Sequence, residues 1–152
     1  MFFGYVYDFG ANEEWMATRG EGAFLNGEPL TGAGPRDYIQ FLSLEATRAQ
    51  LVYESLAALA PLTDRVRVMG AQALTYCHMA AGRTDAVVCL KPSRAVDFAA
   101  AQLIVRERGF AIELFDDPPI DNAPLDLEAR SRVVAAGNPE LCRMLANALG
   151  PL

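Results

Sequence analysis

The sequence has little histidine, little cysteine and no long apolar run. It contains one histidine, His78, and three cysteines, none of which has Cys-x-x-Cys spacing. An odd number of cysteines within apolar segments argues against a disulfide framework and predicts a reducing, cytoplasmic location. A single histidine leaves one possible centre for a Ser-His-Asp or Cys-His arrangement, and no pattern supports it. No apolar stretch is long enough to cross a bilayer, so we expect no association with membranes.

Basic residues are also scarce relative to acidic ones. The 152 residues include 13 Lys and Arg against 19 Asp and Glu, which gives a net charge of −6. A chain this acidic has no general attraction for a polyphosphate backbone, which argues against nucleic-acid binding. Hydrophobic residues make up 52% of the chain. That share supports the core of one ordinary domain and excludes a disordered chain.

The first 35 residues predict an antiparallel hairpin region. Residues 2–7 are rich in aromatic and β-branched side chains, residues 14–18 can return beside them, and Asn26-Gly27 favours a tight turn. This opening lacks the basic region and the cleavage site of a signal peptide. A Gly/Pro-rich connector at residues 31–35 separates the hairpin region, residues 1–35, from the rest.

From residue 38 the pattern alternates between strands and helices. Strands are predicted at residues 38–44, 65–69, 85–90, 110–115 and 132–136, and helices at 51–59, 70–82, 97–105 and 139–149. The helix at 70–82 is predicted to bury Leu74, Cys77 and Ala81. Alternation of this kind predicts a layered α/β domain at residues 36–152. Residues 116–126 are rich in Pro and Asp and predict a solvated loop, because Pro118-Pro119 breaks any calcium-loop spacing.

Two local features can carry chemistry, and each also has a purely structural interpretation. Asp97 begins a predicted helix, where a carboxylate can hold a hard divalent cation, although helix capping is the better local interpretation. Gly70-Ala71-Gln72 joins a strand to a helix, where free N–H groups can bind an anion or a substrate hydroxyl. The same pattern is typical of a tight turn. His78 lies within a predicted helix and is more typical of a packed or surface residue than of a base.

The order of three motifs resembles the inositol monophosphatase family. The motifs are Gly20-Glu21-Gly22-Ala23-Phe24-Leu25-Asn26-Gly27, then Gly70-Ala71-Gln72-Ala73 followed by Ala80-Ala81-Gly82-Arg83-Thr84-Asp85-Ala86, then Lys91-Pro92 followed by Asp97-Phe98-Ala99-Ala100. The resemblance covers essentially the whole chain. It implies the C-terminal portion of an αβαβα fold, in which this chain would form a layered αβα sandwich.

The resemblance also implies site residues and a cofactor. The family hydrolyses phosphate monoesters of inositol and related sugars with magnesium. Asp97 matches the signature aspartate, which is implied to bind Mg²⁺ and to contact the substrate. Gly70, Ala71 and Gln72 match the substrate-side start of a helix. A phosphorylated sugar or inositol is therefore the implied substrate.

The departures from the family pattern predict a limited activity. The motif Asp-Pro-x-Asp-Gly-Thr and the upstream glutamate that share the metals are not found, and the family pattern places both before residue 1. Val96 replaces a tryptophan, and Cys89 or Leu90 lies where inositol-specific members place a substrate-binding glutamate. We therefore assign no catalytic residue and expect no appreciable phosphatase activity from this polypeptide alone, with weak Mg²⁺ binding.

Two alternatives remain open at this point. The chain can be half of a working phosphatase whose N-terminal half lies on another polypeptide, or it can be a non-catalytic binding or assembly module. In the family the opening hairpin belongs to a larger sheet, so its edge would be bare here. Bare apolar edges pair with other chains. We expect a homo-oligomer or a complementing partner.

Overall fold

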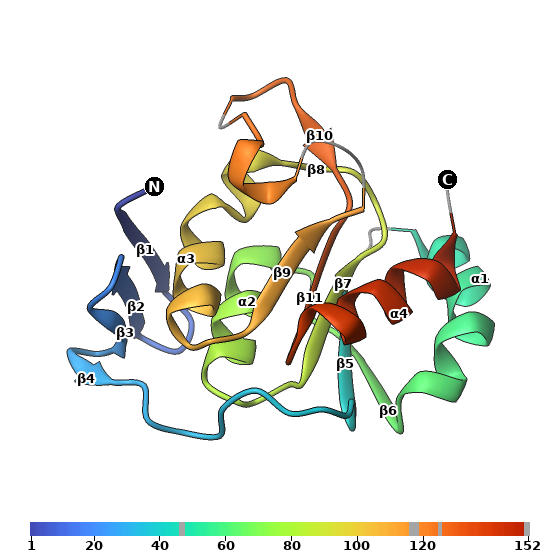
Figure 1. The fold of residues 1–152 in the computed structure, drawn as a ribbon, viewed down its shortest axis with the longest axis horizontal. Coiled ribbons are helices and arrows are strands. Elements are labelled where there is room, and N and C mark those ends of the chain that lie inside the picture. The colour runs from blue at the N-terminus through green and yellow to red at the C-terminus, as the bar shows by residue number, and fades with distance from the viewer. Residues whose placement is uncertain (46–47, 116–118, 125, 151–152) are drawn as a thin grey trace.

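The structure is a computed structural model that describes residues 1–45, 48–115, 119–124 and 126–150. Figure 1 shows four layers: a small sheet, a pair of helices, a larger sheet and a second pair of helices. This is the mixed α/β architecture that the alternating sequence pattern predicts. Residues 116–118 and 125 of the predicted loop lie outside the described part, and Ile120–Asn122 form a short 3-10 turn, η3. No described helix has the length and apolarity that a membrane span requires.

The small sheet is antiparallel, with the strand order β1-β2-β3-β4. Its strands are β1 (Phe3–Asp8), β2 (Glu13–Thr18), β3 (Gly22–Leu25) and β4 (Glu28–Pro29). Asn26 and Gly27 both have positive φ, 51° and 80°, and form the tight turn between β3 and β4. β1 lies at an edge of the sheet. A Cβ at Gly4 would lie 2.6 Å from the carbonyl oxygen of Ala100, so glycine is what lets β1 approach the helices closely.

The larger sheet has the strand order β6-β5-β7-β11-β9. Three strands run parallel, β5 (Phe41–Glu45), β6 (Arg65–Val68) and β7 (Ala86–Cys89), while β11 (Val133–Ala136) is antiparallel to β7 and to β9 (Ala111–Leu114). A separate ribbon pairs β8 (Ser93–Arg94) with β10 (Arg130–Ser131). The strand predicted from residue 38 begins at Phe41. The N–H of Gln40 donates to the Asp85 carboxylate instead of to a neighbouring strand.

Two hydrophobic clusters cover the two faces of this sheet. On one face lie α1 (Ala49–Leu59), continued by the 3-10 turn η1 (Ala60–Leu62), and α4 (Pro139–Leu149). Between the two sheets lie α2 (Gln72–Ala80) and α3 (Ala99–Glu107), which share one cluster with Trp15 and Ala17 of β2. Asn138 caps α4 by accepting a hydrogen bond of 2.9 Å from the N–H of Leu141, and Pro139 occupies the first helical position.

The buried face of α2 is wider than the sequence pattern predicts. Cys77 is fully buried as expected, but so are Tyr76 and Met79, while Leu74 and Ala81 are only half-buried. The predicted set of buried residues on α2 was therefore wrong in part. The reason is that α2 is enclosed by a sheet on each side, so periodicity that assumes one solvent-facing side does not apply.

Candidate functional site

The carboxyl ends of β5, β6 and β7 meet at one edge of the larger sheet, because these strands run parallel. The chain leaves β5 for α1 on one face of the sheet and leaves β6 for α2 on the other face (Figure 1). Ligands of open α/β sheets bind outside the carboxyl ends of the strands, where successive connections diverge in this way. This edge is therefore the candidate functional site.

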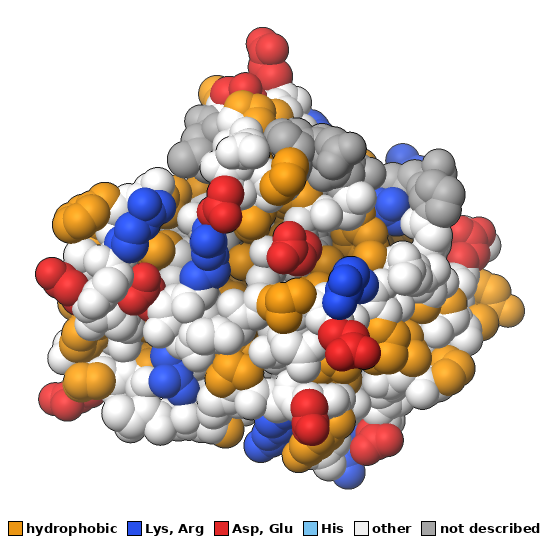
Figure 2. All heavy atoms as spheres, in the orientation of Figure 1, with side chains coloured by type: hydrophobic (Ala, Val, Ile, Leu, Met, Phe, Trp, Pro, Cys, Tyr) orange, Lys and Arg blue, Asp and Glu red, His pale blue; other side chains and the backbone are white. Residues whose placement is uncertain are grey.

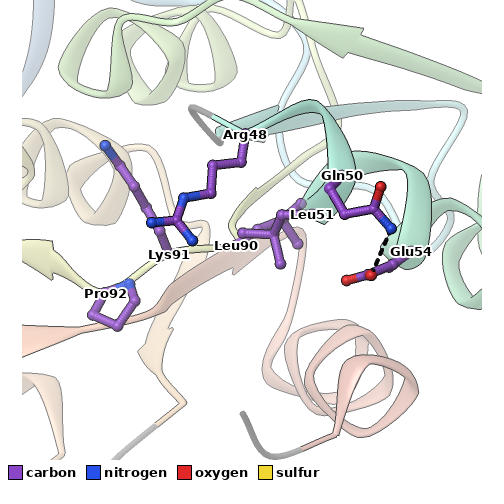
Figure 3. A pocket seen from close by; sticks show the side chains of 7 residues that line it. All are labelled: Arg48, Gln50, Leu51, Glu54, Leu90, Lys91 and Pro92. Carbon is purple, nitrogen blue, oxygen red and sulfur yellow. Dashed lines mark hydrogen bonds between the residues drawn. The ribbon is translucent and has the colours of Figure 1, made fainter.

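A pocket of about 460 Å³ opens at this edge. Its walls come from α1 and from the segment that follows β7, and the lining residues are Arg48, Gln50, Leu51, Glu54, Leu90, Lys91 and Pro92. Figure 3 shows the Arg48 and Lys91 side chains near one another, while Gln50 Nε2 donates to Glu54 at 2.8 Å on the other side of the pocket. Within the described part of the chain, neither Arg48 nor Lys91 forms an ion pair. One side of the pocket therefore offers positive charge to an anionic group, while Glu54 lines the other side (Figure 3).

The predicted helix start is placed at this edge. Gly70 has a φ of 80° and turns the chain into α2, whose N-cap is Ala71. Alanine has no side-chain acceptor, so the N–H groups of the first turn lack both an intrahelical partner and a side-chain cap. The positive end of the helix dipole lies at the same point. These N–H groups can donate to a phosphate oxygen or to a substrate hydroxyl.

The side chain of Gln72 contributes to the interior of the site and not to its surface. Cys89 Sγ lies 3.6 Å from Gln72 Oε1 and 2.9 Å from Ser93 Oγ. Gln72 Nε2 is buried and has no hydrogen-bond partner among the described residues. Burial raises the pKa of the Cys89 thiol, so the group stays protonated near neutral pH and is not a nucleophile. The Cys89 thiol of β7 thus contacts both Gln72 of α2 and Ser93 of β8, in the interior next to the carboxyl edge.

A buried carboxylate that the sequence analysis did not single out lies beside this group. Glu45 ends β5 and pairs in register with Cys89 of β7. It is 4% exposed, and it accepts a hydrogen bond of 2.5 Å from the Thr75 hydroxyl. A charged residue at the end of a strand that is mostly apolar is the sequence signal that could have found it. Its role in the described structure is to join β5 to α2.

Asp97 does not begin the long helix. It belongs to the 3-10 turn η2 (Ala95–Asp97), and α3 starts two residues later, after Phe98. Its carboxylate accepts from the N–H of Arg94 at 3.2 Å and lies 3.5 Å from the Arg94 guanidinium. Asp97 therefore closes a short turn, and the prediction that it caps the following helix was wrong, because Phe98 has a non-helical φ of −136° and interrupts the helix. The side chain remains 36% exposed.

Magnesium requires several oxygen ligands in octahedral geometry. Among the described residues, the one grouping of three His, Cys, Asp or Glu side chains close enough to share an ion consists of Asp8, Glu13 and His78, and Asp97 does not belong to it. The described residues do not by themselves form a magnesium site at Asp97.

Charged side chains are mixed on the face of the molecule drawn in Figure 2. Lys and Arg side chains there are interspersed with Asp and Glu, and that face carries no continuous basic patch.

The comparison with known proteins identifies a family. The sequence profile of the inositol monophosphatase family matches residues 1–150. The chain is 33% identical over 139 residues to a fructose-1,6-bisphosphatase/inositol-1-monophosphatase of Methanothermobacter thermautotrophicus, covering 91% of this chain and 49% of that protein. It is 34% identical over 157 residues to human inositol monophosphatase 2, covering 97% and 51%. The Nus factor SuhB of Escherichia coli is 34% identical over 151 residues, covering 93% and 53%.

Solved structures give the same result for the fold. The structure matches a crystal structure of an inositol monophosphatase-fructose 1,6-bisphosphatase with a TM-score of 0.80 and 26% identity, over 97% of this chain and 57% of that one. A Pyrococcus horikoshii protein matches with a TM-score of 0.77 at 22% identity, over 99% and 58%, which supports the fold alone. The chain spans about half the length of the curated relatives it matches.

Proposed function

The chain belongs to the inositol monophosphatase family, and from this premise we propose that it supplies the substrate-binding edge and one magnesium ligand of a phosphomonoesterase. The substrates in this proposal are phosphate monoesters of inositol or a related sugar. One observation carries the proposal: the uncapped start of α2 and the cationic pocket of Arg48 and Lys91 lie at the same edge of the larger sheet. Both features favour an anionic ligand.

The described residues have binding roles in this proposal. The first-turn N–H groups of α2 donate to a phosphate oxygen or a substrate hydroxyl, while Arg48 and Lys91 attract negative charge to the pocket. Leu51, Leu90 and Pro92 provide an apolar wall that can contact the carbon face of a ring. Asp97 would hold Mg²⁺ together with carboxylates that the described residues do not supply.

The missing ligands define what the 152 residues can do alone. The chain covers about half of each curated relative, and metal-assisted phosphoester cleavage needs cations held in place to bridge the phosphate and activate water. We expect the isolated polypeptide to show no appreciable turnover. Activity is expected when a segment carrying the Asp-Pro-x-Asp-Gly-Thr motif and the upstream glutamate is supplied, in the same polypeptide or in another.

The test is phosphate release from inositol 1-phosphate in the presence of Mg²⁺. The samples are the 152-residue chain, a chimera that joins it to the N-terminal half of the Methanothermobacter relative, and the same chimera with Asp97→Asn. We expect no release from the chain alone and release from the chimera, reduced by at least about 100-fold in the variant, or ~2.7 kcal/mol of transition-state stabilisation. Turnover by the chain alone would refute the division of ligands. Full activity in the Asp97→Asn chimera would refute the role of Asp97.

A binding or assembly function is the second candidate, and the surface of the small sheet favours it. β1 lies at the sheet edge, and its Phe3 and Tyr5 side chains are 52% and 46% exposed. An edge strand with exposed aromatic side chains pairs readily with another chain. We expect self-association that increases with concentration. Light scattering after size-exclusion chromatography measures it, and a monomer at every concentration would contradict this candidate.

A further inference from the structure

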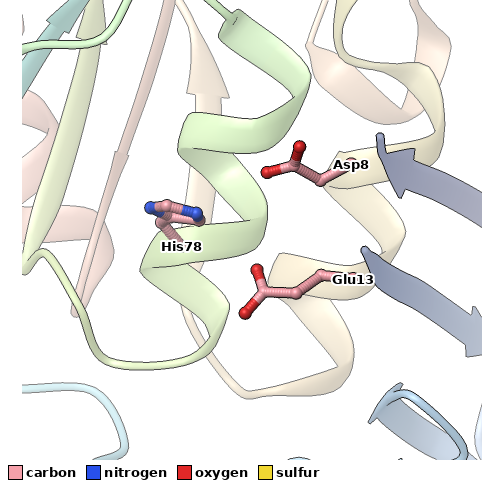
Figure 4. Close-up of side chains that lie close together, drawn as sticks. All are labelled: Asp8, Glu13 and His78. Carbon is pink, nitrogen blue, oxygen red and sulfur yellow. The ribbon is translucent and has the colours of Figure 1, made fainter. Parts of the chain in front are cut away.

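A second group of ligand-type side chains lies between the small sheet and α2, apart from the carboxyl edge of the larger sheet. Asp8 ends β1, Glu13 begins β2 and His78 belongs to α2, and one ligand atom from each lies within 4.8 Å of the other two. Figure 4 shows both carboxylates pointing from the strand ends toward the imidazole ring. All three residues are half-buried.

The side chains of Asp8 and His78 are held in place by neighbouring groups. Asp8 Oδ1 accepts hydrogen bonds from the N–H groups of Gly10 at 2.8 Å and Ala11 at 3.1 Å, and no hydrogen bond reaches its Oδ2 within the described residues. The His78 ring packs against the indole of Trp15, with centroids 6.0 Å apart. Because the strand ends and the helix fix these positions, a ligand would gain three donors without ordering a loop.

The protonation states suit a metal ion. The hydrogen bond from Arg83 lowers the pKa of Glu13, so this carboxylate is charged at neutral pH. Burial, together with the positive charge of Arg83, lowers the pKa of His78, so its imidazole is neutral and has a lone pair to donate. Metal ligands must be deprotonated in this way before they bind.

Arg83 is the cation now in contact with this group. Its Nη1 lies 2.9 Å from Glu13 Oε2 and 3.2 Å from His78 Nε2, and its Nη2 lies 2.5 Å from Glu13 Oε1. The Arg83 side chain is 37% exposed, so it can rotate into solvent without unfolding its surroundings. The pair with Glu13 is bidentate, the Glu13 side chain is only 16% exposed, and the guanidinium also lies over the Trp15 ring, 5.1 Å from its centroid. Only a doubly charged ion bonded to all three ligands can therefore displace Arg83.

We propose that Asp8, Glu13 and His78 form a binding site for a divalent transition-metal ion, which competes with the guanidinium group of Arg83. An imidazole with two carboxylates suits Zn²⁺ better than Mg²⁺, because magnesium prefers an all-oxygen environment. Three protein ligands leave a fourth position for water. The ion would join β1 and β2 to α2. This site is independent of the proposed phosphatase chemistry.

Isothermal titration of the 152-residue chain with Zn²⁺, and with Mg²⁺ as the comparison ion, tests the site. Arg83→Met removes the competing charge and is expected to tighten Zn²⁺ binding by at least about tenfold. Adding His78→Gln to that variant removes a ligand and is expected to weaken binding by about 10- to 100-fold. Glu14→Gln, on the neighbouring position of β2, is the matched control and should leave the affinity unchanged.

A cobalt spectrum separates this site from binding by thiols, because Cys77 adjoins His78 in the sequence. Co²⁺ bound to imidazole and carboxylates gives visible d–d bands without the intense near-ultraviolet band of a thiolate. Where Arg83→Met fails to fold, Arg83→Gln carries the same test. The proposal is overturned if removing Arg83 leaves the affinity unchanged, if the His78 substitution has no effect, or if the thiolate band appears.

Discussion

Asp85 joins the connector after the small sheet to the centre of the larger sheet, and its removal has a calculable cost. The residue lies just before β7 and is 8% exposed. Its Oδ2 accepts from the N–H groups of Gln40 at 3.0 Å and Phe41 at 2.9 Å, and its Oδ1 accepts from Arg36 Nη1 at 3.2 Å. One carboxylate therefore holds three donors, one from the connector and two from the start of β5.

Two substitutions divide this cost between the two oxygens. Asp85→Ala leaves both backbone N–H groups without an acceptor, and since water can reach the half-buried Gln40 and Phe41 we expect a loss of about 3 kcal/mol in the free energy of unfolding. Asp85→Asn can keep its oxygen on the backbone N–H groups, although these hydrogen bonds weaken without the negative charge, and it loses the ion pair. The Arg36 side chain is 36% exposed, so that loss should be about 1 kcal/mol or less.

Urea denaturation followed by circular dichroism measures both variants. A loss of about 3 kcal/mol corresponds to a fall in Tm of roughly 6–12 °C for a chain of this size. Arg36→Met should cost no more than Asp85→Asn, because it removes the same ion pair and leaves the carboxylate charged for the backbone N–H groups. Asp37→Asn changes an exposed neighbour and should stay within about 0.5 kcal/mol of the original. Equal losses for Asp85→Asn and Asp85→Ala would refute the assignment of the backbone hydrogen bonds as the larger contribution.

Two further predictions concern the packing of the small sheet. Gly4→Ala places a Cβ 2.6 Å from the Ala100 carbonyl oxygen, so it should lower the free energy of unfolding, measured by urea denaturation, by about 1–3 kcal/mol. Gly34→Ala, whose Cβ meets no atom within 4 Å, should change that free energy by less than about 0.5 kcal/mol. Equal effects of the two substitutions would contradict the close contact of β1 with α3. The pKa of His78 is lowered in the folded state, chiefly by burial, so the unfolded chain binds the extra proton first and stability should fall as the pH drops below ~6.5. His78→Gln should flatten the dependence of the urea midpoint between about pH 7.5 and 5.5, and an unchanged slope would exclude His78 as its source.

Local patterns predicted the elements of the fold well where one rule decides the conformation. The Asn26-Gly27 pair sets a hairpin turn because both residues tolerate positive φ. Pro139 after a capping Asn138 begins α4 for equally local reasons. The buried face of α2 could not be read in this way, because it depends on a second sheet that packs on the opposite side of the helix.

The residues of the candidate site were likewise predictable only where the local sequence decides their position. The sequence placed Gly70, Ala71 and Gln72 at a helix start, and the structure has α2 begin at Gln72. It gave no sign that Arg48 and Lys91, 43 positions apart in the sequence, line one pocket. Parallel pairing of β5 with β7 brings them together, and such pairing is a property of the whole chain. Motif spacing can identify site residues that are neighbours in the sequence. Site residues that are distant in the sequence can be identified only once the order of the strands in the sheet is known.

Charged side chains of both signs lie at the carboxyl edge. The thiol of Cys89 is neutral because burial raises its pKa, and Glu45 is buried against Thr75. Arg48 and Lys91 line the open pocket without an ion pair among the described residues, and the start of α2 adds the positive end of its dipole. The side of the pocket that carries Arg48 and Lys91 therefore favours an anion, while Glu54 lines its other side. Within the proposed phosphatase, Asp97 would hold Mg²⁺ together with carboxylates from outside the described residues.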